Sequence, residues 1–388
     1  MLNSQKNKFD LDPNIHYLNC AAYGPILKSS AEAGKKGIEQ KMHPNQITSI
    51  SHFTDSDTAR GLFAELINCG DPDSVAIISS VSYGLAIVAA NLETQIKGQN
   101  KKTILTIGDE FPNDFYAFEK VAKKLNLEQN SILKPPGLAN IGQDWNQNIL
   151  NAINTETALI VLPHIHWKYG VKFDLEQISK KCIENDVLLV IDGSQSIGIE
   201  PFDNTKIKAD AIICPAYKWL LGPYSIGFAY FGEKYNEGTP LEETWMNREG
   251  SDDFTTLSMN PKAYRPKAQR YNMGEFSQFI QMPMLIDSLT QILAWKPENM
   301  KTYIEEISLF EIKKLRNLGC EIVSEAFRAK HLFGISLPKN VDKQSFLNAL
   351  KGKNVLVSDR GDVIRISINV FNEKRDLEIL TETLEECL

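Results

Sequence analysis

Short runs of almost unbroken apolar residues recur through the first 231 positions, and they restrict the fold more than any other feature. VLLVID at 187–192 and TALIVLP at 157–163 are examples. A strand that is apolar at successive positions is buried on both faces, whereas an alternating strand leaves one face in water. Amphipathic stretches such as DLEQISKKCIEN separate the runs. The pattern predicts an α/β fold with a mostly parallel sheet covered by helices. The predicted strands lie at 74–79, 102–108, 157–163, 187–192, 209–215 and 226–231.

The chain is long enough for two linked domains, and a change of pattern near KPENM at 296–300 suggests their boundary. A long helix is expected over 275–295. Beyond the boundary the expected order is helix, strand, strand, helix, strand, strand, helix. We therefore divide the chain into an N-terminal arm at 1–20, a large domain at 21–295 and a small C-terminal domain at 296–388. The stretch 232–273 lacks a clear element, and ordered loops of that length are usually functional or interfacial.

The composition excludes several classes of protein. A formal net charge of -7 over 388 residues gives no reason to expect nucleic acid or an anionic membrane as a partner. The start MLNSQKNKFD does not resemble a signal peptide, and no apolar run is long enough to span a membrane, so a cytoplasmic location is expected. The six cysteines lack CxxC spacing and are interpreted as free thiols. The glycine fingerprint of dehydrogenases and the P-loop are both missing.

Two charged residues lie at, or just past, the ends of predicted strands. Asp192 ends the strand at 187–192, and Lys218 comes 26 residues later, just past the next strand. Ligands of parallel α/β sheets bind at the carboxyl ends of the strands. Lys218 stands between Tyr217 and Trp219, where partial desolvation lowers the pKa of an amine and makes it a nucleophile. Taken singly, a surface lysine and a helix-capping aspartate are the ordinary alternatives.

Together the two residues suit pyridoxal 5′-phosphate. That cofactor needs a lysine amine for an imine and an anion that keeps its ring nitrogen protonated. Asp192 can supply the anion and Lys218 the amine. Gln195, three residues after Asp192, can hydrogen-bond the phenolic oxygen of the ring.

A phosphate site is predicted where the first strand gives way to a helix, in ISSVSYG. Ser82 and the amide groups from Val81 to Gly84 lie there, and helix N-termini bind anions. A serine that merely caps the helix is the alternative. Phe111 follows the next strand, before a proline, and is placed to stack on the pyridine ring. Core packing is the alternative for Phe111.

Several motifs occur in the order typical of one superfamily. They are YLNCAAYGP at 17–25, SxxSYG, EFPND, DGSQS, YKWLLGP and the C-terminal IRISINVFN. The chain resembles the class V aminotransferase superfamily from about residue 15 to its end. These fold-type I pyridoxal-phosphate enzymes include cysteine desulfurases, kynureninases and isopenicillin N epimerase-like proteins. The resemblance implies a large domain with a mainly parallel seven-stranded sheet, covered by helices, and a smaller C-terminal α/β domain.

The resemblance also implies roles at the cofactor. Lys218 would hold it as a Schiff base, with Asp192 as the pyridinium partner and Gln195 at the phenolic oxygen. Ser82, beside Val81, falls on the phosphate-binding hydroxyl, and Phe111 falls on the stacking ring. Tyr217 would be a second phosphate or Schiff-base neighbour.

On the substrate side, Arg365 in IRIS matches the arginine that clamps the α-carboxylate in these enzymes. A planar guanidinium suits that role, and a surface ion pair is the alternative. Arg360 in SDRGD is a second candidate. His166 is considered as a polar group facing the substrate. A metal site formed by His164 and His166 is not expected, because no third ligand is evident.

Three positions depart from the family pattern. Trp167 stands where many relatives carry asparagine beside the phenolic oxygen, so its indole N–H could donate or its ring could pack on the cofactor. Pro215 replaces a hydroxyl residue three positions before Lys218. Gly274 begins the segment that contacts the neighbouring subunit's phosphate, but Glu275 follows it in place of threonine.

The function expected from the resemblance is transamination of a small amino acid, with a 2-oxo acid as possible second substrate, in a homodimer with shared active sites. A lyase or an epimerase shares the same first steps and is the alternative. A cysteine desulfurase is disfavoured because no cysteine lies between Cys320 and Cys387 to accept sulfur. A non-catalytic relative would lose Lys218, Asp192 or Arg365, and all three are present.

Overall fold

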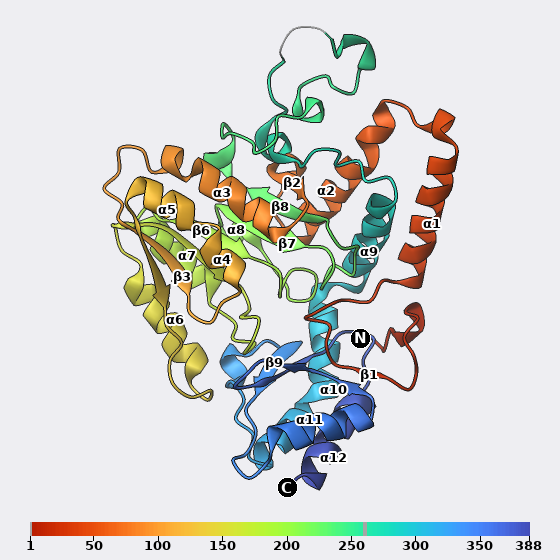
Figure 1. Cartoon of the computed structure of the whole chain (residues 1–388), viewed down its shortest axis with the longest axis vertical. Helices are drawn as coiled ribbons and strands as arrows, with labels where there is room; N and C mark the ends of the chain where they lie inside the picture. The colour runs from red at the N-terminus through yellow and green to blue at the C-terminus, as the bar shows by residue number, and fades with distance from the viewer. Residues whose placement is uncertain (1, 259–261) are drawn as a thin grey trace.

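A computed structural model describes residues 2–258 and 262–388. Its main element is a seven-stranded sheet in the order β2-β8-β7-β6-β5-β3-β4 (Figure 1). Strand β8 runs antiparallel to both of its neighbours, and all other pairings are parallel. The predicted mainly parallel seven-stranded sheet is therefore confirmed. The strands are β2 Val75–Ile78, β3 Thr103–Ile107, β4 Glu128–Ile132, β5 Thr157–Pro163, β6 Leu188–Asp192, β7 Ala211–Pro215 and β8 Gly227–Phe231.

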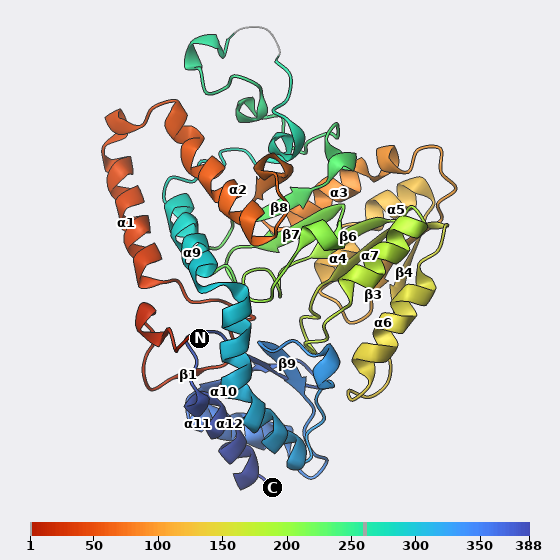
Figure 2. The ribbon, with the colours of Figure 1, turned by 180° about the vertical axis from the view of Figure 1, so that it is seen from behind.

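Helices cover both faces of the sheet, as Figures 1 and 2 show. Successive strand residues enter different cores: Ile77 packs with one group of helices and Ile78 with the other. Helices α3 and α5 cover the face of Ile78, and α2, α6, α7 and α9 cover the face of Ile77. No helix of residues 2–258 and 262–388 is both long and apolar enough to cross a membrane. The helices of this domain are α1 Lys28–Met42, α2 Thr54–Leu66, α3 Val81–Gln95, α4 Pro112–Tyr116, α5 Glu119–Leu125, α6 Ile141–Ala152, α7 Leu175–Glu184, α8 Asn204–Ile207 and α9 Gln281–Trp295.

Two elements of the large domain differ from the sequence prediction. Strand β4, with the sequence EQNSI, is polar and largely exposed at the edge of the sheet, so it carries no apolar signal. The helix expected over 275–295 begins only at Gln281. Glu275 and Gln278 adopt left-handed backbone conformations, with φ of 56° and 41°, which a right-handed helix cannot include.

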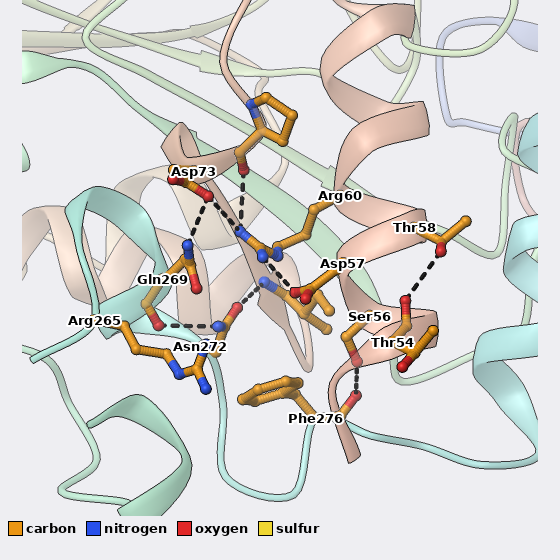
Figure 3. A network of polar contacts seen from close by, with 12 residues as sticks. Thr54, Ser56, Asp57, Thr58, Arg60, Asp73, Arg265, Gln269, Asn272 and Phe276 are labelled. Atoms are coloured by element: carbon orange, nitrogen blue, oxygen red, sulfur yellow. Dashed lines mark hydrogen bonds and ion pairs between the residues drawn. The ribbon is translucent and has the colours of Figure 1, made fainter. Parts of the chain in front are cut away.

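The segment 265–276 covers the other edge of the sheet at β2. The backbone N–H of Ile77 donates to Asn272 Oδ1 at 2.7 Å, and the Met273 N–H donates to the Ile77 carbonyl at 2.9 Å. Figure 3 shows the network behind this contact: Gln269 donates to Asp73, which also faces Arg60 of α2. These bonds satisfy an edge strand that would otherwise expose its backbone, and they hold the chain that leads to Gly274.

The small domain consists of helices around short strands, at the bottom of Figure 1. Its three-stranded sheet has the order β11-β12-β9, and β10 pairs instead with β1 of the N-terminal arm. Between α10 and α11 the structure has one strand, β9, since Glu321 makes only an isolated bridge to Ser336. The prediction of two strands in this interval was therefore wrong. The elements are β1 His16–Tyr17, α10 Pro297–Asn317, β9 Leu332–Ile335, α11 Lys343–Gly352, β10 Val355–Leu356, β11 Ser358–Asp359, β12 Ile364–Ser367 and α12 Lys374–Glu386.

A buried carboxylate ties α10 to the large domain. Helices α9 and α10 meet at Lys296, whose φ of 65° breaks the helical path. Four residues into α10, Lys301 Nζ lies 2.6 Å from Glu200 Oε1, and Lys172 Nζ lies 2.6 Å from the same oxygen. Burial raises the pKa of Glu200, but the charges of Lys172 and Lys301 outweigh it and lower that pKa to about 2.

We predict that Glu200→Gln lowers the free energy of unfolding by about 3 kcal/mol at pH 7, because two lysines lose their buried counter-charge. The depressed pKa gives wild type its advantage above the ordinary carboxyl value of 4.5, and the advantage disappears as the pH falls toward about 2. Denaturant titrations of both proteins from pH 7 to pH 2.5 measure the difference. Glu32→Gln, at an exposed pair on α1, is the control and should change little. A difference that is constant with pH would contradict this account.

Candidate functional site

A cavity of about 490 Å³ opens at the carboxyl ends of β5, β6 and β7, facing the small domain. It brings together ten of the twelve residues singled out from the sequence, and His166 and Gly274 lie outside its lining. The ten are Val81, Ser82, Phe111, Trp167, Asp192, Gln195, Tyr217, Lys218, Arg360 and Arg365.

Lys218 sits on the turn that follows β7, and the segment just after the N-terminal arm holds that turn. The Gly24 N–H donates to the Tyr217 carbonyl at 2.9 Å. A Cβ on Gly24 would lie 1.9 Å from the Lys218 carbonyl oxygen, so the close approach requires glycine. The YLNCAAYGP motif therefore places the wall of the cavity next to the lysine.

The amine of Lys218 and the carboxylate of Asp192 belong to neighbouring strand ends. Burial lowers the pKa of Lys218, and the charge of Asp192 partly restores it. Burial likewise raises the pKa of Asp192, while the Ser194 N–H, 2.7 Å from Oδ1, and the charge of Lys218 oppose the rise. A lysine with a lowered pKa has a larger neutral fraction near pH 7 and is a better nucleophile and base.

Gln195 lines the cavity, but neighbours of its own already hold its amide group. Trp219 Nε1 donates to Gln195 Oε1 at 2.8 Å, and Gln195 Nε2 donates to the Ala21 carbonyl at 3.2 Å. One hydrogen on Nε2 remains for a ligand. The structure thus orients the side chain and limits the predicted contact with a phenolic oxygen to that single donor.

The N-terminus of α3 forms the far end of the cavity. Ser80, and not Ser82, caps the helix: its Oγ accepts from the Tyr83 N–H at 3.1 Å. Ser82 is exposed to the cavity, so the capping alternative for this residue was wrong. The N–H groups of Val81 and Ser82 come before the first helical hydrogen bond and remain available to an anion.

Phe111 and Trp167 form an aromatic wall. Phe111 is 45% exposed, which excludes core packing, and its ring centroid lies 5.8 Å from Lys218 Nζ. The rings of Phe111 and Trp167 meet edge to face at 5.8 Å. Trp167 Nε1 donates to the Asp109 carbonyl at 2.8 Å. The indole N–H is therefore engaged, and only ring packing remains of the two roles considered for Trp167.

Beside Lys218 the cavity is lined by tyrosines. The ring of Tyr217 lies 4.6 Å from that of Tyr224 and 5.5 Å from that of Tyr23. Burial, and the neighbouring Tyr224 and Tyr23, raise the pKa of Tyr217 to about 12, so its hydroxyl is a neutral donor near pH 7. Pro215 also lines the cavity and offers no hydroxyl, as the sequence indicates. Tyr217 stands nearby as a hydroxyl donor.

Arg365 enters the cavity from β12 of the small domain and is 2% exposed. Its Nη1 donates to the Trp167 carbonyl at 3.0 Å, whereas Nε and Nη2 are buried without a hydrogen-bond partner among the described residues. A buried guanidinium with free N–H groups suits an incoming carboxylate, and the surface ion pair considered for Arg365 is wrong.

His166 and Gly274 lie elsewhere. His166 is buried, and its Nδ1 faces the backbone N–H groups of Lys168 and Tyr169 at 3.3 and 3.4 Å, so the predicted contact with substrate is not supported. The Gly274 N–H is bound by the carboxylate of Glu242. Within the described ranges, no cluster of three His, Cys, Asp or Glu side chains suits a metal.

Sequence reasoning missed two buried acids next to the site. Glu110 lines the cavity; its Oε1 accepts from the Phe111 N–H at 2.7 Å, and its Oε2 lies 3.8 Å from His166 Nε2 without a hydrogen-bond partner in the described structure. Asp114 is buried with both oxygens unpartnered among the described residues. Burial and the charge of Asp192 raise the pKa values of both acids well above their usual range. Their position in EFPND, directly after a strand, was the available signal.

Comparisons with known proteins identify the family of the chain. The family described as aminotransferase class-V matches residues 39–380. An uncharacterized aminotransferase of Bacillus subtilis, YcbU, is 23% identical over 337 residues, with 85% of each chain covered. Isopenicillin N epimerase of Amycolatopsis lactamdurans is 21% identical, with 98% of this chain and 97% of that protein covered. The apo structure of a cysteine desulfurase from Thermococcus onnurineus NA1 matches with a TM-score of 0.82 at 16% identity, covering 100% of this chain and 98% of that one. That likeness shows a shared fold.

We predict that Asp114→Asn stabilises the cofactor-free protein increasingly from pH 4 to pH 8. The pKa of Asp114 is raised in the folded state, so its contribution to stability is complete below the ordinary value of 3.8 and is lost as the pH rises. Asparagine does not ionise, so the variant avoids this loss of stability as the pH rises. Thermal unfolding across the pH range measures the gain, with the exposed Asp10→Asn as control. An equal gain at pH 4 and pH 8 would show that Asp114 does not titrate in this way.

Proposed function

The chain belongs to the class-V aminotransferase family, and we propose that it catalyses transamination of a small amino acid in the cavity around Lys218. Pyridoxal 5′-phosphate is the cofactor of this family. The observation that carries the proposal is the juxtaposition of Lys218, Asp192 and Arg365 around one cavity. An amine, an anion and a free guanidinium are the groups that bind, respectively, an aldehyde, a protonated ring nitrogen and a carboxylate.

The residues present fit the cofactor. Lys218 supplies the amine for the covalent attachment, and Asp192 lies on the adjacent strand end for the ring nitrogen. Ser82 and the free N–H groups at the start of α3 suit the phosphate, since Ser80 leaves them unoccupied. The face of Phe111 is exposed for stacking. Bound pyridoxal phosphate supplies an electron sink for negative charge that develops on the substrate Cα.

The protein's own part is to orient the substrate and move a proton. The free N–H groups of Arg365 hold the α-carboxylate. Burial lowers the pKa of Lys218, so its neutral amine can accept the Cα proton and later return it. The rings of Phe111, Trp167 and Tyr217 exclude water from the reacting atoms.

Two observations favour transamination. One relative is named as an aminotransferase, and the described lining of the cavity holds no cysteine for sulfur transfer. YcbU, matched over 85% of its length, is named as an aminotransferase. Epimerisation is the named activity of another full-length relative and remains the second candidate. Sulfur transfer requires a thiolate at the site, and none of the six cysteines is among the described residues that line the cavity. Cys20 and Cys320, for example, are buried, and burial raises the pKa of each to about 12.

We predict that Lys218→Ala abolishes the visible absorbance band of the protein loaded with pyridoxal phosphate and lowers turnover at least about 100-fold. Lys41→Ala, at an exposed position on α1, is the control and should retain the band. Spectra of purified wild type and both variants test this directly. Absence of the band in wild type would sink the assignment of Lys218.

The same preparation distinguishes the reactions. Titration with a panel of L-amino acids should bleach the band and release one equivalent of 2-oxo acid in the absence of a second substrate, and a 2-oxo acid should restore it. Catalytic release of ammonia with pyruvate would indicate a lyase. Loss of optical activity without release of a 2-oxo acid would indicate an epimerase.

We also propose that the protein is a homodimer, joined in part by an aromatic patch made by Ile50, His52, Trp245 and Phe254. The His52 ring lies 6.0 Å from Trp245 and 5.6 Å from Phe254, and Ile50, Trp245 and Phe254 are between 42% and 55% exposed. Contiguous exposed aromatic residues are characteristic of interfaces. The patch lies on the long 232–273 segment and the adjoining turn, close to the chain that carries Gly274.

For the dimer we predict that light scattering after gel filtration gives twice the mass of one chain. Phe254→Asp should shift the mass toward the monomer, because it places a charge in an apolar contact. Phe310→Asp, which changes a still more exposed ring on α10, away from the patch, is the control and should leave the mass unchanged. A wild-type monomer with full cofactor occupancy would overturn the proposal.

A further inference from the structure

Two arginines of the cavity carry positive charge that the protein itself does not neutralise. Among residues 2–258 and 262–388, no carboxylate lies within 4.0 Å of the guanidinium of Arg360 or of Arg365. Both side chains line the cavity. Buried or half-buried charges without partners are costly, so such a pair marks a place where anions bind.

The free hydrogen-bond donors of Arg365 lie along one edge of its guanidinium. Nη1 is used by the Trp167 carbonyl, and the buried atoms without a partner are Nε and Nη2. Those two N–H groups point in the same direction and match the two oxygens of one carboxylate. One carboxylate can therefore bind both nitrogens of Arg365 that lack a partner.

Arg360 then remains for another acid. Its Nε is also buried without a partner in the described structure, and its Nη2 makes only a long contact of 3.4 Å with the Ser358 hydroxyl. The guanidinium carbon lies 5.3 Å from the centroid of the Trp167 ring, a cation–π contact that leaves the N–H edge free.

Both arginines belong to the β11–β12 hairpin, and both contact Trp167. Ser358 pairs with Arg365 across β11 and β12, and the Arg360 N–H closes the turn onto the Val363 carbonyl at 2.9 Å. Asp362 anchors the turn to the large domain, 2.5 Å from Lys168 Nζ and 3.0 Å from the Tyr169 hydroxyl. The two guanidinium groups are thus held beside the same Trp167.

The positive charges of Arg360 and Arg365 repel each other. Burial, followed by the positive charge of Arg360, lowers the pKa of Arg365 to about 9. Arg365 is still protonated near pH 7, so two like charges face one cavity. The phosphate of a cofactor does not relieve them, since the N–H groups for it lie at the start of α3, which reaches the cavity from the large domain. Carboxylates of the substrate can supply the negative charge that this wall lacks.

We propose that the substrate is an amino acid with a second carboxylate on its side chain, the α-carboxylate binding Arg365 and the side-chain carboxylate binding Arg360. This inference rests on the proposed function, because it presumes an amino-acid substrate at Lys218. It assigns Arg360 as the residue that selects dicarboxylic over neutral substrates.

The test uses diacids without an amine, which cannot react at Lys218 and so report the arginines alone. Calorimetry with the cofactor-loaded protein measures Kd for succinate, glutarate and adipate, each compared with its monoamide. At the best chain length the diacid should bind at least about tenfold more tightly than the monoamide, which is the effect of one charge-assisted contact. Equal binding of diacid and monoamide at all three lengths would overturn the proposal without any variant.

Variants assign the preference to its residue. Arg360→Gln should reduce the preference for diacid to less than about twofold and leave monoamide binding unchanged. Arg365→Gln should weaken both ligands about 10- to 100-fold. Arg375→Gln, an exposed arginine of α12, is the control. A preference that survives Arg360→Gln overturns the assignment of Arg360.

Comparing the diacid titrations with the visible spectrum of the same protein mixed with pyridoxal phosphate separates this proposal from the previous one. Diacid preference in a protein that never forms the visible band would refute the role of Lys218 and leave the diacid site intact. A normal band with no diacid preference would refute the diacid site alone.

Discussion

The attraction between Lys218 and Asp192 depends on a single topological fact, the adjacency of parallel strands β6 and β7. Asp192 pairs in register with Ile213 of β7, so the carboxylate at the end of one strand comes beside the turn that carries the lysine. Both groups are desolvated, and each stabilises the charged form of the other against burial. Helices on both faces of the sheet make the burial possible, and the segment around Gly24 packs against the turn that carries Lys218.

The other charged and polar groups of the site come from both domains. The large domain contributes the acids Glu110 and Asp114, whose pKa values are raised by burial and by the charge of Asp192, and the start of α3 with its free N–H groups. The small domain contributes the two arginines on one hairpin. Negative groups of a ligand therefore have two positions, at the start of α3 and at the arginines, and Lys218 lines the same cavity.

The junction between domains determines how well these parts align. Glu200 bridges Lys172 of the large domain and Lys301 of α10, and Asp362 bridges the hairpin to Lys168 and Tyr169. Because Glu200 binds two lysines of separate segments and Asp362 binds two neighbouring residues of one loop, a relative movement of the domains would break several contacts at once. Arg365 also donates to the Trp167 carbonyl across the same junction.

The sequence by itself determined the sheet, since strands buried on both faces leave apolar runs, and it identified most of the cavity, since functional side chains directly follow those runs. It could not reveal β4, whose edge position removes the need for apolar residues, nor the late start of α9, which two left-handed residues impose. Only the tertiary structure decided which way side chains point. His166 Nδ1 faces backbone N–H groups, Gln195 accepts from Trp219, and the Trp167 indole donates to Asp109, because a polar atom bonds to a partner that the fold brings near it. Among the described residues the fold brings no partner to Nε and Nη2 of Arg365, a feature that linear sequence does not encode.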